Sequence, residues 1–184
     1  DLGWEKNTQY NVGLDVSLWR GTLGFTADYY YSKTTDMLFD VPVSSVSGLT
    51  SSNVNIGSMQ NKGIELALTS RRSFGDFSNA FAANWSLTRN KVLRLGDENA
   101  DIINESSYAG GYYLTRVGQP VGCYYLLVQD GIFHNQEELD SYPHFDTTPI
   151  GDFRFVDANG NGILEKDADR VLVGNSMPDF YYGF

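Results

Sequence analysis

Cysteine is almost absent from this sequence of 184 residues, in which Cys123 is the only one. A single cysteine excludes a disulfide within the chain and a zinc site built from several thiolates. Cys123 stands between Gly122 and Tyr124, and we expect it to be a small hydrophobic side chain that is buried or half-buried. His134 and His144 lie in a loop-like region without the spacing of helical metal ligands, so we expect both at the surface.

Long hydrophobic runs and an excess of positive charge are also lacking. No segment approaches 18 consecutive apolar residues, so the sequence contains no membrane-spanning helix, although strands of a membrane barrel carry a weaker signal and are not excluded. The chain has 13 basic and 23 acidic residues and a formal charge of −10, which argues against a protein that binds nucleic acid. Only 5 prolines accompany 12 tyrosines, 11 phenylalanines and 19 glycines, a composition that favours strands and turns.

Residues 9–32 show the clearest pattern, two strands joined by a tight turn at Arg20-Gly21. Side chains in a strand point to alternate faces, so each strand has one apolar and one polar face, and pairing them as a hairpin places both apolar faces on one side. The apolar positions are Tyr10, Val12, Leu14, Val16 and Leu18, followed by Leu23, Phe25, Ala27, Tyr29 and Tyr31. Runs of about ten residues fit tilted transmembrane barrel strands, but a soluble antiparallel sheet has the same alternation.

A second unit repeats this arrangement. Strands are predicted at residues 63–69 and 79–88 around a turn at Gly75-Asp76, and the polar segment 44–55 (SSVSGLTSSNVN) is predicted to be a long loop before them. Short turns at one end of the strands and long loops at the other are typical of outer-membrane barrels. The repetition therefore favours a barrel over a sandwich.

The remaining segments are predicted to be less regular. We expect a loop at residues 92–115, a strand at 124–129 before an Asp130-Gly131 turn, one helical turn at 135–139 capped by Asn135, and strand-like pieces at 171–173 and 179–184. Trp4, Trp19 and residues 29–31 could form interfacial aromatic girdles or cap an ordinary sheet core, and the sequence leaves both interpretations open.

Residues 157–169 (DANGNGILEKDAD) contain the sharpest local motif. Calcium loops place oxygen ligands at positions 1, 3 and 5, a glycine at 6, a backbone carbonyl at 7 and an acid at 12. The candidate calcium ligands are Asp157, Asn159, Asn161, Ile163, Asp167 and Asp169. Position 12 is Ala168, however, and two Asn-Gly pairs also suit a tight turn that needs no ion. Weak calcium binding and a purely structural turn both remain open.

Aromatic side chains gather near the middle of the sequence. The candidate substrate-binding residues are Tyr108, Tyr112, Tyr113, Tyr124 and Tyr125. Their rings could stack on sugars, or they could pack between loops. No catalytic arrangement stands out, because neighbouring acids in loops do not provide the separation across a cleft that glycoside hydrolysis requires. We therefore expect no enzymatic activity.

Seven short motifs occupy residues 2–9, 28–30 with 33–38, 55–65, 117–122, 130–133, 151–162 and 174–178. Together, in this order and over nearly the whole chain, they resemble the SusC/RagA family of TonB-linked outer-membrane transporters. The resemblance implies an all-β fold: antiparallel hairpins from part of a large transmembrane β-barrel of about 22 strands, with long extracellular loops. The chain as a whole, residues 1–184, would be a C-terminal portion of the barrel, without the plug and the final strands.

The resemblance also implies a cellular role. The parent protein would lie in the outer membrane of a Bacteroidetes-type Gram-negative bacterium and import glycans or peptides with a SusD-like surface lipoprotein. The TonB complex would act through an N-terminal part that this chain lacks, and membrane lipid would cover the outside of the barrel. No cofactor is implied beyond the calcium already considered.

Two rival classes remain from the residues alone. The first is a soluble secreted β-sandwich that binds carbohydrate or calcium, and the second is a hydrolase. A sandwich would bury the apolar strand face against a second sheet, whereas a barrel would turn it to lipid. Isolated from a barrel, the piece would have two open sheet edges, through which we expect it to self-associate.

Overall fold

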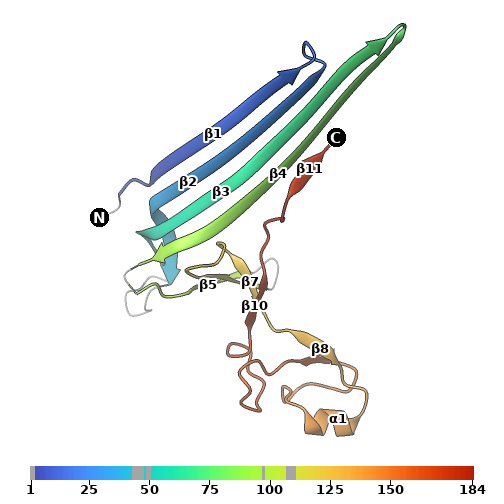
Figure 1. Cartoon of the computed structure of the whole chain (residues 1–184). Helices are drawn as coiled ribbons and strands as arrows, with labels where there is room; N and C mark the ends of the chain where they lie inside the picture. Colours follow the sequence, from blue (N-terminus) through green and yellow to red (C-terminus); the bar gives the residue numbers. More distant parts are fainter. Residues whose placement is uncertain (1–2, 43–47, 49–50, 97, 107–110) are drawn as a thin grey trace. The chain divides into compact units, whose positions relative to one another are not determined.

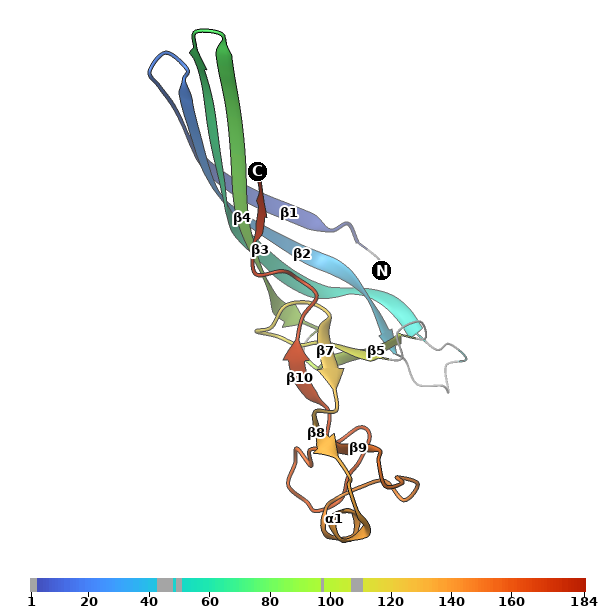
Figure 2. The same cartoon turned by 90° about the vertical axis from the view of Figure 1, so that its right-hand side faces the viewer.

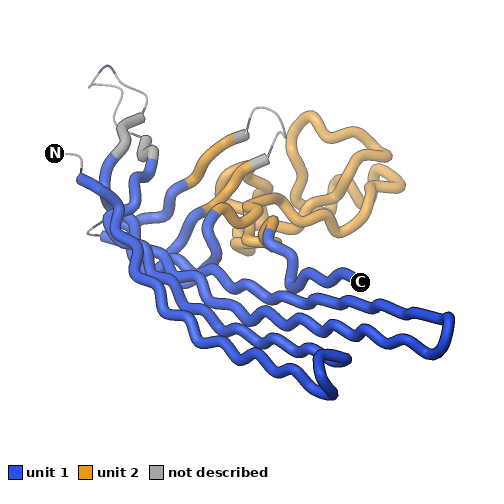
Figure 3. The backbone as a smooth tube through the Cα atoms, turned by 90° about the horizontal axis from the view of Figure 1, so that it is seen from above, with its two compact units in different colours: residues 1–102, 115–121, 177–184 blue, residues 103–114, 122–176 orange. Residues whose placement is uncertain are grey.

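The computed structural model describes residues 3–42, 48, 51–96, 98–106 and 111–184. In the described residues the regular secondary structure is nearly all β-strand, with one short helix (Figure 1). The elements are β1 (Lys6–Leu18), β2 (Leu23–Pro42), β3 (Ser51–Phe74), β4 (Phe77–Leu95), β5 (Ile102–Ser106), β6 (Gly111–Thr115), β7 (Cys123–Leu126), β8 (Gln129–Ile132), α1 (Gln136–Ser141), β9 (Phe153–Phe155), β10 (Val171–Gly174) and β11 (Tyr181–Gly183). They fall into two compact units, residues 1–102, 115–121 and 177–184 in one and 103–114 and 122–176 in the other (Figure 3).

The first unit is built on the two predicted hairpins. Its sheet has the order β1-β2-β3-β4-β11 with antiparallel pairing throughout, and its long strands bend together (Figure 2). The first turn occupies residues 19–22, where Trp19 and Arg20 take positive φ of 50° and 56° before Gly21. Thr22 closes it by donating from its backbone N–H and its hydroxyl to the carbonyl of Trp19. The all-β prediction and both hairpins are confirmed.

Register gives this sheet two different faces. Val12 pairs with Tyr29, Leu14 with Ala27 and Val16 with Phe25, and the pairing continues into β3 and β4. The apolar face, as we call it, comprises Tyr10, Val12, Leu14, Val16, Leu18, Leu23, Phe25, Ala27, Tyr29, Tyr31, Ile64, Leu66, Leu68, Phe81, Ala83, Trp85 and Leu87. The opposite side, the polar face, carries Asn11, Asp15, Thr26, Asp28, Tyr30, Glu65, Ala67, Thr69, Asn84, Ser86 and Thr88. Tyr30 therefore cannot belong to an external aromatic girdle with Tyr29 and Tyr31.

Three of the predicted loops and turns are partly wrong. Residues 51–55 belong to β3, where Asn53 pairs with Asp40 and Asn55 with Leu38, while residues 43–47 and 49–50 lie outside the described part. The segment 92–115 contains the end of β4 as well as β5 and β6. Asp130-Gly131 lies within β8, at a register shift against β9. Strand pairing supplies backbone hydrogen bonds to polar segments whose composition alone suggests a loop.

A small hydrophobic core closes one end of the first unit. Val92, Leu95 and Ile102 are buried, and the core is completed by four partly buried residues: Phe39, Ile56, Val117 and Val121. Backbone hydrogen bonds join Val92 to Gln119 and Gly118, and Asn90 accepts a hydrogen bond from the N–H of Val121. Residues 115–121 are thereby held against β4 at this end of the strands.

The second unit contains two further sheets, ordered β10-β7-β6-β5 and β8-β9, and the helix α1. Asn135 caps α1 by accepting a hydrogen bond from Glu138 N–H at 2.9 Å, as predicted. Phe133 is 1% exposed and packs edge-on against the rings of Tyr142 and His144. His144 is therefore half-buried rather than a surface histidine.

Two further observations concern Cys123 and the helices of the described residues. Cys123 is fully buried in β7, as predicted, and burial raises the pKa of its thiol. None of the helices in the described part of the chain has the length and apolar character needed to cross a membrane.

Candidate functional site

The polar face of the first unit carries two carboxylates side by side. Asp28 on β2 is directly opposite Glu65 on β3, and Glu65 is opposite Ser86 on β4. Residues paired in this way have Cβ atoms about 4.5–5.5 Å apart, and like charges at that distance repel. Asp15 lies on the same face, where it accepts a hydrogen bond from the Thr26 hydroxyl at 2.7 Å. This sheet thus presents concentrated negative charge on one side.

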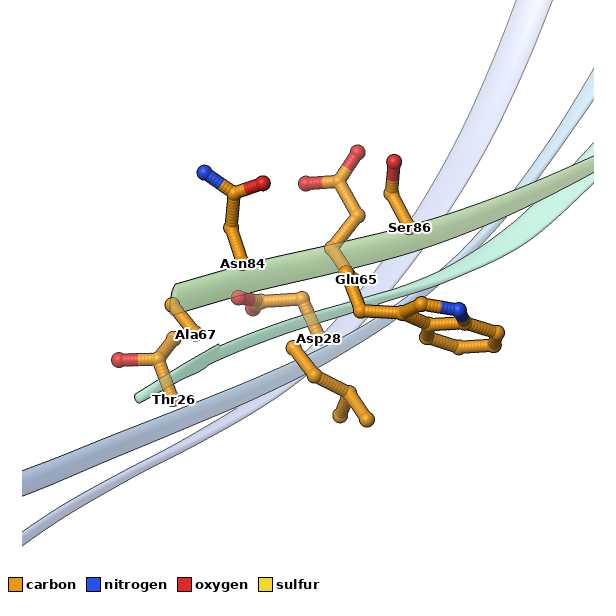
Figure 4. Close-up of a pocket in the computed structure, with 8 residues that line it drawn as sticks. Thr26, Asp28, Glu65, Ala67, Asn84 and Ser86 are labelled. Carbon is orange, nitrogen blue, oxygen red and sulfur yellow. The ribbon is translucent and has the colours of Figure 1, made fainter. Parts of the chain in front are cut away.

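Asp28, Glu65 and Ser86 line a shallow hollow of about 310 Å³ (Figure 4). Figure 4 shows Glu65, Asn84 and Ser86 on the same side of the sheet, with Thr26 and Asp28 beside them. A second hollow of about 340 Å³ shares Asp28 and Glu65. The second hollow is mainly polar, whereas the first is also lined by Leu66, Ala67 and Trp85, so together they offer hydrogen-bonding groups with some apolar surface.

The predicted tyrosines do not form one platform. Tyr112 pairs with Tyr125 and Tyr113 with Tyr124 in the ladder between β6 and β7, so the two pairs lie on opposite faces of that sheet. The rings of Tyr113 and Tyr124 are 5.7 Å apart between centroids, at an interplanar angle of 48°. Tyr108 lies outside the described residues.

In the Tyr112–Tyr125 pair, a basic side chain covers one of the rings. The Arg170 guanidinium carbon lies 3.4 Å from the centre of the Tyr112 ring, a cation–π contact. One face of Tyr112 is therefore covered, and the Tyr113–Tyr124 pair is the better candidate for stacking on a ligand.

The motif at residues 157–169 folds into a turn in which oxygens accept backbone N–H groups. Asp157 Oδ1 accepts from Gly160 at 2.8 Å and from Asn161 at 3.3 Å, and Asp157 Oδ2 accepts from Gly162 at 2.7 Å. The side-chain oxygens of Asn159 and Asn161 accept from the N–H groups two positions ahead. Glycines 160 and 162 have φ of 72° and 82°, the left-handed conformation that tight Asn-Gly turns need.

Asp169 lies inside this turn and is fully buried. Its Oδ2 accepts from Glu165 N–H at 2.7 Å, and its Oδ1 accepts from Ala158 at 3.0 Å and Asn159 at 3.2 Å. These hydrogen bonds lower the pKa of Asp169, and the hydrogen bond from the Glu165 N–H is the largest cause. The carboxylate thus joins the two ends of the motif through backbone hydrogen bonds.

The six candidate calcium ligands are divided by the structure. Asp157, Asn159, Asn161 and Asp169 are brought together in the turn, whereas Asp167 is 89% exposed and forms an ion pair with Arg170. The Ile163 side chain points to solvent, and its N–H donates to Asn161. Within the described ranges no group of three or more His, Cys, Asp or Glu side chains is arranged to hold a metal ion.

Sequence reasoning missed a second polar cluster, which lies in the second unit. Arg154 donates to Asp130 Oδ1 at 2.8 Å, and the Tyr142 hydroxyl donates to Asp130 Oδ2 at 2.9 Å. The hydrogen bond from Arg154 is the main cause of the lowered pKa of Asp130, whereas burial and the bond to Asp130 raise the pKa of Tyr142. These residues come from β8, β9 and the segment after α1, so no local sequence signal joins them. The polar face, in contrast, could have been predicted as a candidate site from the period-two alternation of its residues.

Comparisons with known proteins agree with this geometry. Residues 1–163 match the family model described as TonB dependent receptor-like, beta-barrel. The chain is 36% identical to TonB-dependent receptor P3 of Formosa agariphila and 27% identical to TonB-dependent receptor SusC of Bacteroides thetaiotaomicron, with 100% of this chain aligned in both cases. It spans 19% of the length of each of these relatives.

A solved structure gives the same fold. The structure of the RagAB peptide transporter superposes with a TM-score of 0.70 at 24% sequence identity, covering 98% of this chain and 19% of that one. The family match extends over most of the chain, and the strand alternation is that of a barrel wall. The chain therefore belongs to the TonB-dependent receptor β-barrel family.

Proposed function

We propose that this chain forms part of the barrel wall of an outer-membrane transporter that imports glycans or peptides. The observation that carries the proposal is the division of β1–β4 into an apolar and a polar face in continuous register. In a membrane barrel the first face meets lipid and the second lines the interior. The hydrated acidic wall around Asp28 and Glu65 then borders the path of the solute.

The dimensions of the apolar face support this assignment. From the level of Lys62 to that of Phe74, β3 runs about 40 Å at roughly 3.3 Å per residue. At a strand tilt of about 45° this corresponds to about 28 Å along the membrane normal, close to the height of the apolar band on outer-membrane barrels. Tyr10 and Tyr31 lie at one end of this span, and Phe74 and Phe77 at the other.

Exposure argues against the soluble sandwich. Val12 is 71% exposed and Leu14 is 58% exposed, and no second sheet of the first unit covers them in the described residues. A sandwich would bury this face to remove it from water. The names of the relatives, TonB-dependent receptors, support a transporter rather than a hydrolase.

The proposal includes partners that act on the whole receptor. A SusD-like surface lipoprotein would cover the extracellular end, and the TonB complex would supply energy through a part of the receptor outside this chain. The RagAB structures, which share this fold, are of a peptide transporter, and this supports a peptide substrate. Glycan import rests on the resemblance of the sequence motifs to the SusC/RagA family. Within the second unit, Tyr113 and Tyr124 would supply an aromatic surface for the substrate.

Gene deletion in the source bacterium tests the transport proposal. We expect the deletion strain to lose uptake of one class of labelled oligosaccharide or peptide, and uptake to return with the intact gene. The surface lipoprotein should copurify with the receptor from detergent-solubilised membranes. Unchanged uptake of every labelled pool, with a receptor that fractionates outside the outer membrane, would contradict the proposal.

Calcium binding at residues 157–169 is a second, accessory proposal. Four oxygen-bearing side chains of the motif gather in one turn, which supports it. The same side chains are already engaged by backbone N–H groups, so the ion would add to a turn that is closed without it. Its test is given in the Discussion.

A further inference from the structure

Positive charge is concentrated at one end of the apolar face, although the chain as a whole is acidic. Lys33, Lys62, Arg89 and Lys91 make up 4 of the 13 basic residues and are all exposed. In the register of the sheet, Lys62 is opposite both Tyr31 and Arg89, and Gln60 is opposite both Lys33 and Lys91. All four side chains therefore leave the sheet on its apolar side, in two adjacent rows across β2, β3 and β4.

The three lysines of this group, which we call the lysine triangle (Lys33, Lys62 and Lys91), are close enough to bind one anion together. Lys33 and Lys91 are two strands apart, which places their Cα atoms about 10 Å from each other. Lys62 is diagonal to both, at about 7–8 Å. Four-carbon side chains can bring their ammonium groups together over such distances.

Two described acids on neighbouring strands are paired with other cations. Asp179 pairs with Arg89 at 3.0 Å, and Asp36 pairs with Lys6 at 3.1 Å. No acidic residue in the described part of the chain forms an ion pair with Lys33, Lys62 or Lys91. Among the described side chains, these three exposed ammonium groups thus lie near one another without an ion-pair partner, an arrangement that attracts an anion.

The position of the lysine triangle identifies the kind of anion. The triangle lies just beyond the rows of apolar side chains that begin with Val12 and Ile64, and Tyr10, Tyr29 and Tyr31 lie beside it. A membrane protein presents the same order along its surface: apolar side chains face the acyl chains, aromatic rings lie at the interface, and basic side chains face the lipid head groups. A water-soluble anion has no acyl chain that could pack against the adjacent apolar rows, whereas a lipid does.

The direction of the strands indicates the leaflet. The four-residue turn at 19–22 and the two-residue turn at 75–76 lie at the opposite end of the sheet. Short turns face the periplasm in outer-membrane barrels, so the lysine triangle lies at the outer leaflet. We propose that Lys33, Lys62 and Lys91 bind the phosphate groups of an anionic lipid of the outer leaflet. This inference rests on the membrane orientation of the proposed function, but not on transport.

Lipid retention by the purified full-length receptor tests the proposal. Lipid A, a diphosphorylated glycolipid, is titrated into the detergent-solubilised receptor, and the bound fraction is measured by native mass spectrometry. We expect saturable binding by the natural receptor and binding about tenfold weaker in the K33Q/K62Q/K91Q variant, since each lysine contributes to attraction of anionic lipid. The matched control, R20Q/R72Q, removes two positive charges near the short turns and should bind lipid A as the natural receptor does.

Two further arms separate the alternatives. Lipid A stripped of its phosphates should bind as weakly as lipid A binds to the triple variant, and millimolar inorganic phosphate should not displace the intact lipid. Equal retention by the triple variant, equal retention of the dephosphorylated lipid, or displacement by inorganic phosphate would each overturn the proposal. Heat-modified gel migration checks that every variant is folded. The lipid-binding measurement contains no transported substrate. A negative result would therefore leave the transport proposal unaffected, and a failed uptake experiment would leave the lipid-binding result unaffected.

Discussion

The ring of Tyr30 lies across the backbone of Gly63 on the polar face of the sheet. A Cβ atom built on Gly63 would be 2.5 Å from Tyr30 Cε1 and 2.5 Å from the carbonyl oxygen of Leu87. Because the ring passes over the glycine, the Tyr30 hydroxyl on β2 reaches the Thr88 hydroxyl on β4 at 2.8 Å. The missing side chain thus allows a hydrogen bond that spans three strands.

Substitution of Gly63 by alanine should therefore destabilise the receptor. Overpacking of this kind costs about 1–3 kcal/mol, because both the ring and a backbone carbonyl would have to move. The matched control is Gly13→Ala, where the nearest atom is the end of the flexible Asp28 carboxylate. Urea unfolding of the receptor in lipid vesicles measures the difference, and a larger loss for Gly13→Ala than for Gly63→Ala would contradict the packing described here.

Neighbouring residues of β3 should respond oppositely to a new charge. Leu66→Arg places a cation on the apolar face, where it should cost about 2–4 kcal/mol near the membrane midplane. Ala67→Arg places it on the polar face beside Asn84, where water and the acidic wall receive it. The same vesicle unfolding measurement applies. Similar losses for the two variants would show that the faces are not divided between lipid and water.

The Tyr113–Tyr124 pair should affect uptake more than the Tyr112 hydroxyl does. We expect Tyr113→Ala with Tyr124→Ala to raise the half-saturating substrate concentration about tenfold, equivalent to about 1.4 kcal/mol. Tyr112→Phe keeps the ring under Arg170 and serves as the control. Uptake of labelled substrate by complemented cells is the measurement, and unchanged uptake in the double variant would remove these tyrosines from the binding surface.

The turn at residues 157–169 should open in acid through Asp169. Its pKa is lowered by backbone hydrogen bonds, so its contribution is present above the ordinary carboxyl pKa of about 4 and is lost as pH falls through the lower folded value. Asp169→Asn should speed amide exchange in this segment about tenfold at neutral pH, since hydrogen bonds to a charged acceptor are lost. The variant should also lose the acid dependence.

Hydrogen exchange with mass spectrometry on the full-length receptor measures both effects after correction for intrinsic exchange. Asp167→Asn is the control because its carboxylate is exposed and pairs with the Arg170 side chain. Equal protection in the natural receptor and in Asp169→Asn would mean that Asp169 does not hold the turn closed.

Calcium should raise the melting temperature of the receptor slightly if the same turn binds it. Millimolar calcium should give an increase of about 1–2 °C, as expected for a weak site. Asp157→Asn should abolish the increase and Asp167→Asn should not. The absence of any ion-dependent change in the natural receptor would leave the purely structural turn as the interpretation of the motif.

The period-two pattern was sufficient to predict the hairpins, because alternation along a strand is local. It was also sufficient for the division into two faces, since pairing across a tight turn fixes the register. The cap on α1 and the burial of Cys123 likewise follow from neighbouring residues. The family motifs could be recognised because each is a short run of neighbouring residues.

Tertiary pairing decided what the local pattern could not. Residues 51–55 are polar, yet they extend β3 because residues of β2 supply partners for their backbone groups. Tyr112, Tyr113, Tyr124 and Tyr125 were each predicted as candidates for substrate binding, but their register in β6 and β7 separates them into two pairs on opposite faces. The lysine triangle comes from three strands, at positions nearly sixty residues apart in the sequence. The sequence by itself determined which residues form strands and which side of each strand is apolar, whereas only the pairing of distant strands placed the charged and aromatic side chains beside one another.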